Sequence, residues 1–208
     1  LDVERRNKSG IAPVKGLLEE IEGAKTIKEL RALQLKYAAQ GYGVQYAAGF
    51  GADEKDVRNN ILNIYQSGLT LGQKDYYLNN DSATVAIREA YKKYIDRMFR
   101  LYGFSEAEAE QRSNDLFRQE TLVALISKSM TELRDPQANY NKMSLAELKA
   151  DYPNIPIEQL ANAEGIKSEY IQHVIVGQPA FMTGLDKLVS LQSVNDVKAL
   201  MEWDVISR

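Results

Sequence analysis

The stretch FRQETLVALISKSMTELRDPQANYNKM, at residues 117–143, gives the strongest indication of the fold, because it predicts a long helix that runs into a structured loop. Its apolar residues recur at spacings of three or four, which predicts an amphipathic helix with a buried stripe of Leu122, Ile126, Met130 and Leu133. We expect the helix to stop at Arg134-Asp135-Pro136, because proline lacks an amide donor and disfavours helical backbone in the preceding residue. Ser144 and Glu147 then form a capping box that predicts the start of another helix.

A second long helix is predicted immediately before this one, at about Ser82–Tyr102. Its expected buried stripe consists of Ile87, Tyr91, Tyr94, Met98 and Leu101. Gly103 suits the end of that helix, and Ser105 with Glu108 is a capping box that opens the following helix near Glu106. Because the link is so short, the two helices should pack antiparallel.

Three short segments have the residue types of strands. They are Val44–Phe50, Asn59–Gln66 and, as a third candidate, Ile171–Val176. The turn-like residues Gly51–Asp56 predict a hairpin with a long loop between the first two. Further helices are expected at residues 13–23, 26–40, 144–150, 156–163, 179–191 and 194–207. The predicted fold is a mainly α, multi-helix single domain over residues 1–208, with a long antiparallel helix pair and a small antiparallel β-sheet.

Composition excludes several classes of protein. Hydrophobic residues make up 44% and charged residues 26% of the 208 residues, which is typical of a globular chain. The net charge of −3, with both signs mixed, argues against nucleic acid as a partner. No apolar run approaches the length of a transmembrane segment. The chain has no cysteine, no visible signal peptide and no initiator methionine, and we expect it to be an excised segment of a longer protein.

The sequence contains no set of residues that could bind a catalytic metal. Its single histidine, His173, is followed by Val174, whereas a zinc peptidase needs two histidines and a glutamate in H-E-x-x-H. We expect His173 to be an ordinary packed or half-exposed strand residue. Motifs of serine hydrolases, P-loop proteins and dinucleotide-binding proteins are absent too. We therefore assign no catalytic and no metal-binding residue, and the substrate-contacting residues are unknown.

Glu120 falls between Leu116 and Val123 on one face of the predicted long helix. A carboxylate there could be catalytic, but we favour a semi-buried ion pair with an arginine. Arg134 and Asp135 are expected to hold the loop that follows.

Four aromatic residues are also assigned structural roles. Tyr76, Tyr77 and Tyr140 are expected at the edge of the core with their hydroxyl groups hydrogen-bonded, and substrate contact is the less favoured alternative. Trp203 is expected to be buried in the last helix, because Val197 and Leu200 precede it at helical spacing.

Four motifs carry a family resemblance. They are R-D-P-x3-Y-N-K-M-S at Arg134–Ser144, G-L-T-L-G-Q-K-D-Y-Y-L at Gly68–Leu78, V-I-V-G-Q-P at Val174–Pro179 and K-A-L-M-E-W-D-V-I at Lys198–Ile206. In this order they resemble the N-terminal, mostly helical domain of the neprilysin-like zinc metallopeptidases, which include the bacterial oligopeptidase O enzymes. Gly72 stands where that family usually has proline, so we expect a looser turn there.

The resemblance implies a parent enzyme that is a secreted, periplasmic or cell-envelope zinc metalloendopeptidase acting on peptides. Its catalytic domain would carry H-E-x-x-H and a further glutamate ligand, and the helical domain would face it across a cavity and restrict access to small substrates. The present segment would then be non-catalytic and bind no zinc itself, with peptide substrates and the missing catalytic domain as its partners. A stand-alone helical binding or scaffold protein is the alternative. An independent hydrolase with an unrecognised site is disfavoured, because nucleophile and metal motifs are missing.

This hypothesis also makes expectations about the surface. The face toward the cavity should be polar and concave, and apolar surface should be uncovered near the termini, at Leu1, Val3, Val205 and Ile206. Leu1 and Arg208 should lie on the same side of the domain.

Overall fold

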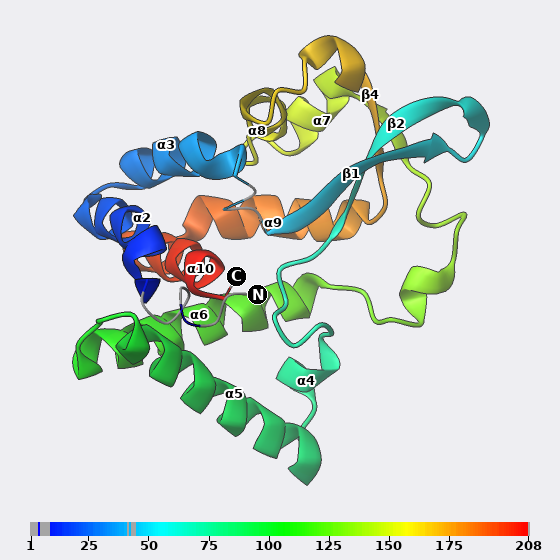
Figure 1. Ribbon diagram of the computed structural model, residues 1–208. Helices are drawn as coiled ribbons and strands as arrows, with labels where there is room; N and C mark the ends of the chain where they lie inside the picture. Colours follow the sequence, from blue (N-terminus) through cyan, green and yellow to red (C-terminus); the bar gives the residue numbers. More distant parts are fainter. Residues whose placement is uncertain (1–3, 5–8, 41, 43–44, 208) are drawn as a thin grey trace.

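The computed structural model describes residues 4, 9–40, 42 and 45–207, and the predicted mainly α fold is confirmed (Figure 1). The helices are α2 (Ala12–Gly23), α3 (Ile27–Ala38), α4 (Asp75–Leu78), α5 (Ser82–Leu101), α6 (Glu106–Ile126), α7 (Leu145–Asp151), α8 (Ile157–Ala163), α9 (Pro179–Leu191) and α10 (Val194–Ile206), with 3-10 turns at η1 (Glu132–Arg134) and η2 (Ser168–Ile171). The strands are β1 (Tyr46–Asp53), β2 (Asp56–Gln66), β3 (Lys142–Ser144) and β4 (His173–Val176).

Helices α5 and α6 form the predicted antiparallel pair along one side of the structure (Figure 1). Gly103 links them with a φ of +97°, a left-handed conformation that glycine adopts without strain. The capping box of α6 is present: the Ser105 hydroxyl accepts the Glu108 amide, and the Glu108 carboxylate accepts the Ser105 amide at 2.9 Å. The start of α6 at Glu106 is therefore confirmed.

The predicted end of the long helix is wrong, because α6 stops at Ile126 and not at Arg134. The backbone of Lys128 is bonded instead to the side chain of Gln66. The Gln66 side-chain amide donates to the Lys128 carbonyl at 2.9 Å, and the Lys128 backbone amide donates to the Gln66 side-chain carbonyl at 2.8 Å. These bonds between distant parts of the chain replace another helical turn. Met130, predicted to be buried, is 53% exposed. The face of α6 that is buried consists of Ala109, Arg112, Ser113, Leu116, Gln119, Glu120, Val123 and Ala124.

The predicted stripe of α5 is also partly wrong. Its buried residues are Tyr91, Ile95 and Phe99, one turn apart. Ile87, Tyr94 and Leu101 are exposed to 40, 49 and 62%. Both stripes satisfy helical periodicity, and the position of α6 against α5, with the Trp203 ring on Tyr91 and Phe99, decides which one is covered.

The four described strands form one mixed sheet in the order β1-β2-β4-β3. The predicted hairpin is present, but both strands extend into the expected loop, and only Glu54 and Lys55 separate them. The expectation of a wholly antiparallel sheet is wrong, since β2 and β4 are parallel. Parallel neighbours need a long crossover connection, which local residue patterns do not reveal. The strand β3 was not predicted, and it pairs antiparallel with β4.

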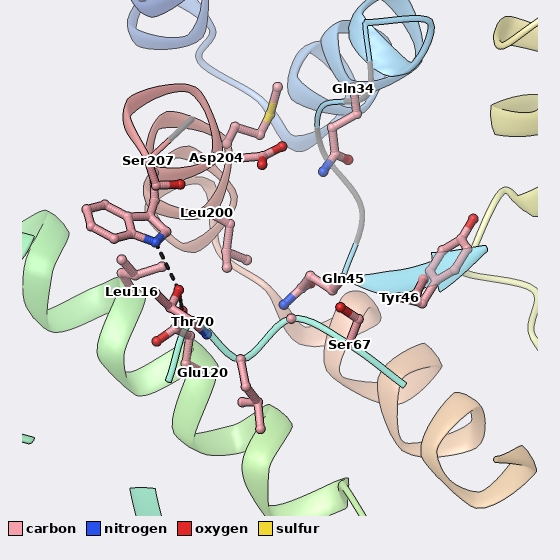
Figure 2. Close-up of a pocket in the computed structure, with 15 residues that line it drawn as sticks. Gln34, Gln45, Tyr46, Ser67, Thr70, Leu116, Glu120, Leu200, Asp204 and Ser207 are labelled. Atoms are coloured by element: carbon pink, nitrogen blue, oxygen red, sulfur yellow. Dashed lines mark hydrogen bonds between the residues drawn. The ribbon is translucent and has the colours of Figure 1, made fainter. Parts of the chain in front are cut away.

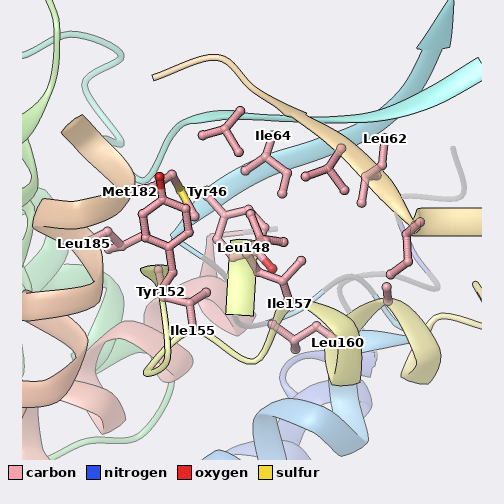
Figure 3. Packing of buried hydrophobic residues seen from close by; sticks show 14 of the residues in the cluster. Tyr46, Leu62, Ile64, Leu148, Tyr152, Ile155, Ile157, Leu160, Met182 and Leu185 are labelled. Atoms are coloured by element: carbon pink, nitrogen blue, oxygen red, sulfur yellow. The ribbon is translucent and has the colours of Figure 1, made fainter. Parts of the chain in front are cut away.

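The apolar residues are buried in two clusters. One lies between the sheet and helices α7, α8 and α9, where Ile64 and Leu62 of β2 face Leu148, Leu160 and Met182 (Figure 3). The other lies between the helix pair and helices α2, α3 and α10. None of the described helices is both long and apolar enough to span a membrane.

Burial of Trp203 in the second cluster is confirmed, with an exposed fraction of 5%. The expectation of apolar surface at the end of the chain is wrong for Val205 and Ile206, which are both buried, because they continue the packed face of α10. Leu1, Val3 and Arg208 lie outside the described residues.

We predict that Trp203→Ala lowers the free energy of unfolding by about 3–5 kcal/mol, since it removes a buried indole. The indole ring also contacts the rings of Tyr91, Tyr94 and Phe99, at centroid distances of 6.3, 5.9 and 6.1 Å. Urea unfolding followed by circular dichroism measures the loss. The exposed Leu191→Ala is the control and should change stability by less than about 0.5 kcal/mol. A loss below about 1 kcal/mol for Trp203→Ala would contradict the burial of the ring.

Candidate functional site

Glu120 is buried at the centre of a group of hydrogen bonds that joins four segments of the chain. One carboxylate oxygen accepts the hydroxyl and amide of Thr70 at 2.5 and 3.3 Å. The other accepts the hydroxyls of Tyr77 and Tyr91, each at 2.8 Å. The expected ion pair between Glu120 and an arginine is therefore wrong, because its hydrogen-bond donors among the described residues are neutral. The predicted satisfied hydroxyl of Tyr77 is confirmed.

Trp203 extends this group, because its indole N–H donates to the Thr70 hydroxyl at 3.1 Å (Figure 2). We call Thr70, Tyr77, Tyr91, Glu120 and Trp203 the Glu120 cluster. It joins two of the motifs, residues 68–78 and 198–206, to α5 and α6. Sequence reasoning missed it as a group. The only available signal was the spacing of Glu120 from Leu116, which marks a buried face.

Burial is the main cause of the pKa shifts of the titratable side chains in the Glu120 cluster. Burial raises the pKa of Glu120, although the hydrogen bonds from Thr70, Tyr91 and Tyr77 oppose that change. Burial and the nearby Glu120 charge also raise the pKa of Tyr77 and of Tyr91, so both phenols remain donors. Because both oxygens of Glu120 already accept hydrogen bonds, the geometry favours a structural role over that of a general base.

A cavity of about 450 Å³ opens beside the Glu120 cluster (Figure 2). Among the described residues that line it, the charged ones are two carboxylates, Glu120 and Asp204. The others are Gln34, Gln45, Tyr46, Ala47, Ser67, Gly68, Leu69, Thr70, Leu116, Leu200, Met201, Trp203 and Ser207. Amides, hydroxyls and a few large apolar groups therefore face one space, a combination that suits polar ligands of moderate size.

A second buried group of charges joins α2, α6 and α10. Arg112 donates to Glu202 at 2.7 Å and to Glu22 at 2.5 Å. Lys198 donates to the backbone carbonyl of Glu22 at 2.6 Å. The sequence analysis did not single out these residues, although Arg112 precedes Leu116 by one helical turn and so falls on the buried face.

The two carboxyl groups around Arg112 titrate in opposite directions. Burial raises the pKa of Glu202 to about 9, and contact with Glu22 adds to this. Burial would also raise the pKa of Glu22, but hydrogen bonds with Glu202 and Arg112 outweigh it and lower that pKa. Atom Oε1 of Glu202 accepts no hydrogen bond from the described residues. The raised pKa of Glu202 agrees with its burial and with this unsatisfied oxygen, because a neutral carboxyl group costs less to bury than a charged one.

The loop at residues 134–144 is joined to the hairpin through Asp53. This carboxylate accepts the Tyr140 hydroxyl at 2.8 Å, the Lys142 ammonium at 2.7 Å and the Lys55 amide at 3.0 Å. Bonds from Lys142, Tyr140 and the Lys55 amide lower the pKa of Asp53 to about 2. The predicted satisfied hydroxyl of Tyr140 is confirmed.

The same loop is bonded to the end of β4. The backbone carbonyl of Asn141 accepts the Val176 amide at 2.9 Å, and the Asn141 side-chain amide donates to the Val176 carbonyl at 3.0 Å. The buried Gln178 accepts the Gln66 amide at 2.8 Å and donates to Asn139 at 3.0 Å. Between them Gly177 is required, since a Cβ there would lie 2.5 Å from the Tyr65 ring. The motifs at residues 134–144 and 174–179 therefore meet at the sheet.

The remaining predicted residues have simple positions. Asp135 holds its loop as expected, since its carboxylate accepts two following amides at 3.0 and 3.1 Å. Arg134 is exposed, and its amide donates to the Thr131 carbonyl at 3.2 Å, but its side chain makes no hydrogen bond to a described residue, so its expected role there is not seen. Tyr76 packs at the edge of the second core. Gly72 has a φ of +83°, which proline cannot adopt because its ring holds φ near −65°; the turn has a different backbone rather than only a looser one.

His173 begins β4 and is exposed, opposite Ser144 of β3. Within the described part of the chain, no three histidine, cysteine, aspartate or glutamate side chains gather in a way that could hold a metal ion.

The sequence pattern of peptidase family M13 matches residues 1–208, the whole length of the chain. The chain belongs to peptidase family M13. The resemblance to neprilysin-like zinc peptidases is thereby confirmed. In this chain the four motifs meet in pairs, two of them at Glu120 and two at the sheet.

Individual relatives agree with this membership. Rat endothelin-converting enzyme-like 1 is 29% identical over 127 residues, which are 59% of this chain and 16% of that protein. Neprilysin-3 of Drosophila melanogaster is 24% identical over 202 residues, 89% of this chain and 25% of that protein. Human neprilysin is 24% identical over 176 residues, 75% of this chain and 23% of that protein. The chain thus spans a quarter or less of these relatives.

Solved structures share the fold. The zinc metalloprotease ZMP1 of Mycobacterium tuberculosis, in complex with an inhibitor, superposes with a TM-score of 0.88 at 24% identity, over 98% of this chain and 31% of that one. PEPO from Lactobacillus rhamnosis gives a TM-score of 0.76 at 21% identity, over the same shares.

We predict that Glu202 makes this M13 chain less stable as the pH rises. Its pKa is raised in the folded state, so its contribution is complete below the ordinary value of 4.5 and is lost as the pH rises through about 9. Within that window the group should lower the free energy of unfolding by about 1.4 kcal/mol per pH unit. Glu202→Gln should flatten this slope in urea unfolding measured between pH 5 and pH 9, whereas the exposed Glu89→Gln should leave it unchanged. Equal slopes for Glu202→Gln and the unmodified chain would contradict the assignment.

Proposed function

We propose that these 208 residues are a non-catalytic part of a zinc metalloendopeptidase that hydrolyses peptides, and that a catalytic domain elsewhere in the same polypeptide supplies the zinc ligands. Membership of peptidase family M13 supports the reaction. The sequence holds a single histidine, so the two histidines of H-E-x-x-H cannot both come from it. The small share of each relative that the chain covers supports a longer parent.

The observation that carries the proposed role is the 450 Å³ cavity. We propose that its face lies toward the catalytic domain across a space filled with water and admits only small peptides. Amides, hydroxyls and carboxylates line it, as a surface that meets water should show. In the described part of the chain, the large apolar residues that are most exposed all lie outside the lining of this cavity; they are Phe50, Val57, Tyr65, Val85, Ile87, Tyr94, Leu101, Leu125, Met130, Tyr170 and Leu191.

A stand-alone binding or scaffold protein is the alternative, and the gene itself distinguishes the two. H-E-x-x-H followed by a further glutamate in the same reading frame supports the peptidase, whereas a stop codon directly after residue 208 supports the scaffold. We further propose that the parent enzyme is secreted, periplasmic or attached to the cell envelope. Fractionation of the source cells tests that location.

We predict that the 208-residue chain alone retains no stoichiometric zinc after dialysis and hydrolyses no peptide. The same chain joined to its downstream sequence should bind about one zinc ion and lose activity with a chelator. Metal analysis and a peptide assay measure both properties. Chelator-sensitive hydrolysis by the 208 residues alone would overturn this division of roles.

We also predict that the cavity face sets the length limit of the parent enzyme. In the full-length enzyme, Gln45→Ala should shorten a side chain at the cavity and raise kcat/KM for long peptides relative to short ones. Leu191→Ala, exposed and absent from the cavity, is the matched control. The proposed gatekeeping is wrong if Gln45→Ala and removal of the segment from a still active enzyme both leave the length limit unchanged.

A further inference from the structure

Arg31 is a half-buried arginine on α3 whose described hydrogen bonds all go to neutral groups. Its guanidinium donates to the side-chain carbonyls of Gln34 and Gln192, each at 2.7 Å, and to the Val189 backbone carbonyl at 3.4 Å. Within the described part of the chain, no aspartate or glutamate forms an ion pair with it. This is unusual, because buried arginines in folded proteins are normally paired with carboxylates.

The carboxylates on the neighbouring helices are already engaged elsewhere. Asp186 of α9 accepts the amide and side-chain N–H groups of Asn154 at 2.7 and 2.8 Å. Glu158 of α8 pairs with Lys149 at 2.7 Å. Neither reaches the guanidinium of Arg31 within ion-pair distance.

Arg112 gives an internal comparison. Burial lowers the pKa of Arg31, and no neighbouring carboxylate offsets that change. Burial acts on Arg112 in the same direction, but Glu202 and Glu22 outweigh it and raise its pKa. Arg112 has two carboxylate counter-ions, whereas Arg31 has none among the described residues. The free-energy cost of removing the Arg31 charge from water is therefore not offset by an ion pair.

A cavity of about 40 Å³ lies against Arg31, between α3, β1, α8 and α9. Its walls are mostly apolar, with Tyr46, Leu160 and Leu185 among them. One water needs only about 10–15 Å³ of such volume, so the space also admits a group with two oxygens. Gln34, Gln45 and Tyr46 line both this cavity and the larger one beside the Glu120 cluster, so the two spaces are neighbours.

We propose that this cavity binds a carboxylate group, which pairs with the guanidinium of Arg31 and supplies the missing counter-ion. The planar fork of arginine matches the two oxygens of a carboxylate, and the apolar walls strengthen the pairing by excluding water. The carboxylate has two possible sources: the free C-terminus of a short peptide, or an aspartate or glutamate side chain from another part of the polypeptide. The site itself is independent of zinc and of the proposed peptidase activity.

The test follows the Arg31 side-chain Nε–H signal of the 208-residue chain by ¹H–¹⁵N NMR. The signal is assigned by its loss in Arg31→Gln. Three probes are titrated at constant ionic strength. N-acetylglycine presents a terminal carboxylate, the α-amide of N-acetylglutamic acid presents a side-chain carboxylate, and N-acetylglycinamide has the same size but no charge. Arg58→Gln, an exposed arginine on the hairpin, is the control for loss of one positive charge.

We expect at least one carboxylate probe to shift the Arg31 signal and to bind about tenfold or more tightly than the uncharged amide. The tighter of the two carboxylate probes identifies the source. Arg58→Gln should bind as the unmodified chain does. The proposal is overturned if the acid and amide probes act equally, or if none shifts the signal at concentrations up to about 50 mM, where even a very weak ion pair is detectable. Because the comparison of acid and amide uses the unmodified chain, a folding defect in Arg31→Gln cannot imitate the result.

Discussion

The buried carboxylate of Glu120 on α6 is bonded to α4, α5 and the loop at Thr70, and through Thr70 to α10. A buried charge without compensation would cost several kcal/mol, so the chain must bring donors to it. It does so with hydroxyls from three places, Thr70, Tyr77 and Tyr91, and Trp203 adds its N–H to Thr70. Tyr77, Tyr91 and Trp203 also make ring contacts in the second core. Hydrogen bonding therefore fixes the relative positions of elements that hydrophobic packing alone would leave adjustable.

The four motifs that carry the family resemblance have the same kind of explanation. Residues 68–78 and 198–206 meet at Glu120, and residues 134–144 and 174–179 meet at the sheet, through Asp53, Asn141 and Gln178. These contacts join segments that lie far apart in the sequence. The motifs therefore hold the fold together. The contacts that the motifs make in this structure are contacts within the fold.

Local signals predicted the elements well, and non-local contacts explain the errors. Capping boxes at Ser105 and Ser144 marked helix starts correctly, because a cap is formed by residues three apart. The end of α6 was missed since it is set by Gln66, some sixty residues earlier in the chain. The parallel pairing of β2 with β4 and the neutral partners of Glu120 were missed for the same reason. Periodicity placed Glu120 on a buried face, but no pattern in one sequence states which side chains will meet it.

Asp53 and Glu202 are two carboxyl groups whose contributions to stability depend on pH in opposite ways. Asp53 holds the hairpin to its loop with a pKa lowered to about 2 by Lys142, Tyr140 and the Lys55 amide, so its stabilising contribution is present above the ordinary value of 3.8 and is lost in acid. Glu202 joins α2, α6 and α10 with a pKa raised to about 9, so its contribution is complete below the ordinary value of 4.5 and is lost as the pH rises through about 9. The two groups therefore contribute most to stability at opposite ends of the pH range. In the Glu120 cluster the phenols of Tyr77 and Tyr91 keep their protons because burial raises their pKa, and burial also raises the pKa of Glu120, so this cluster shares the direction of Glu202 and not that of Asp53.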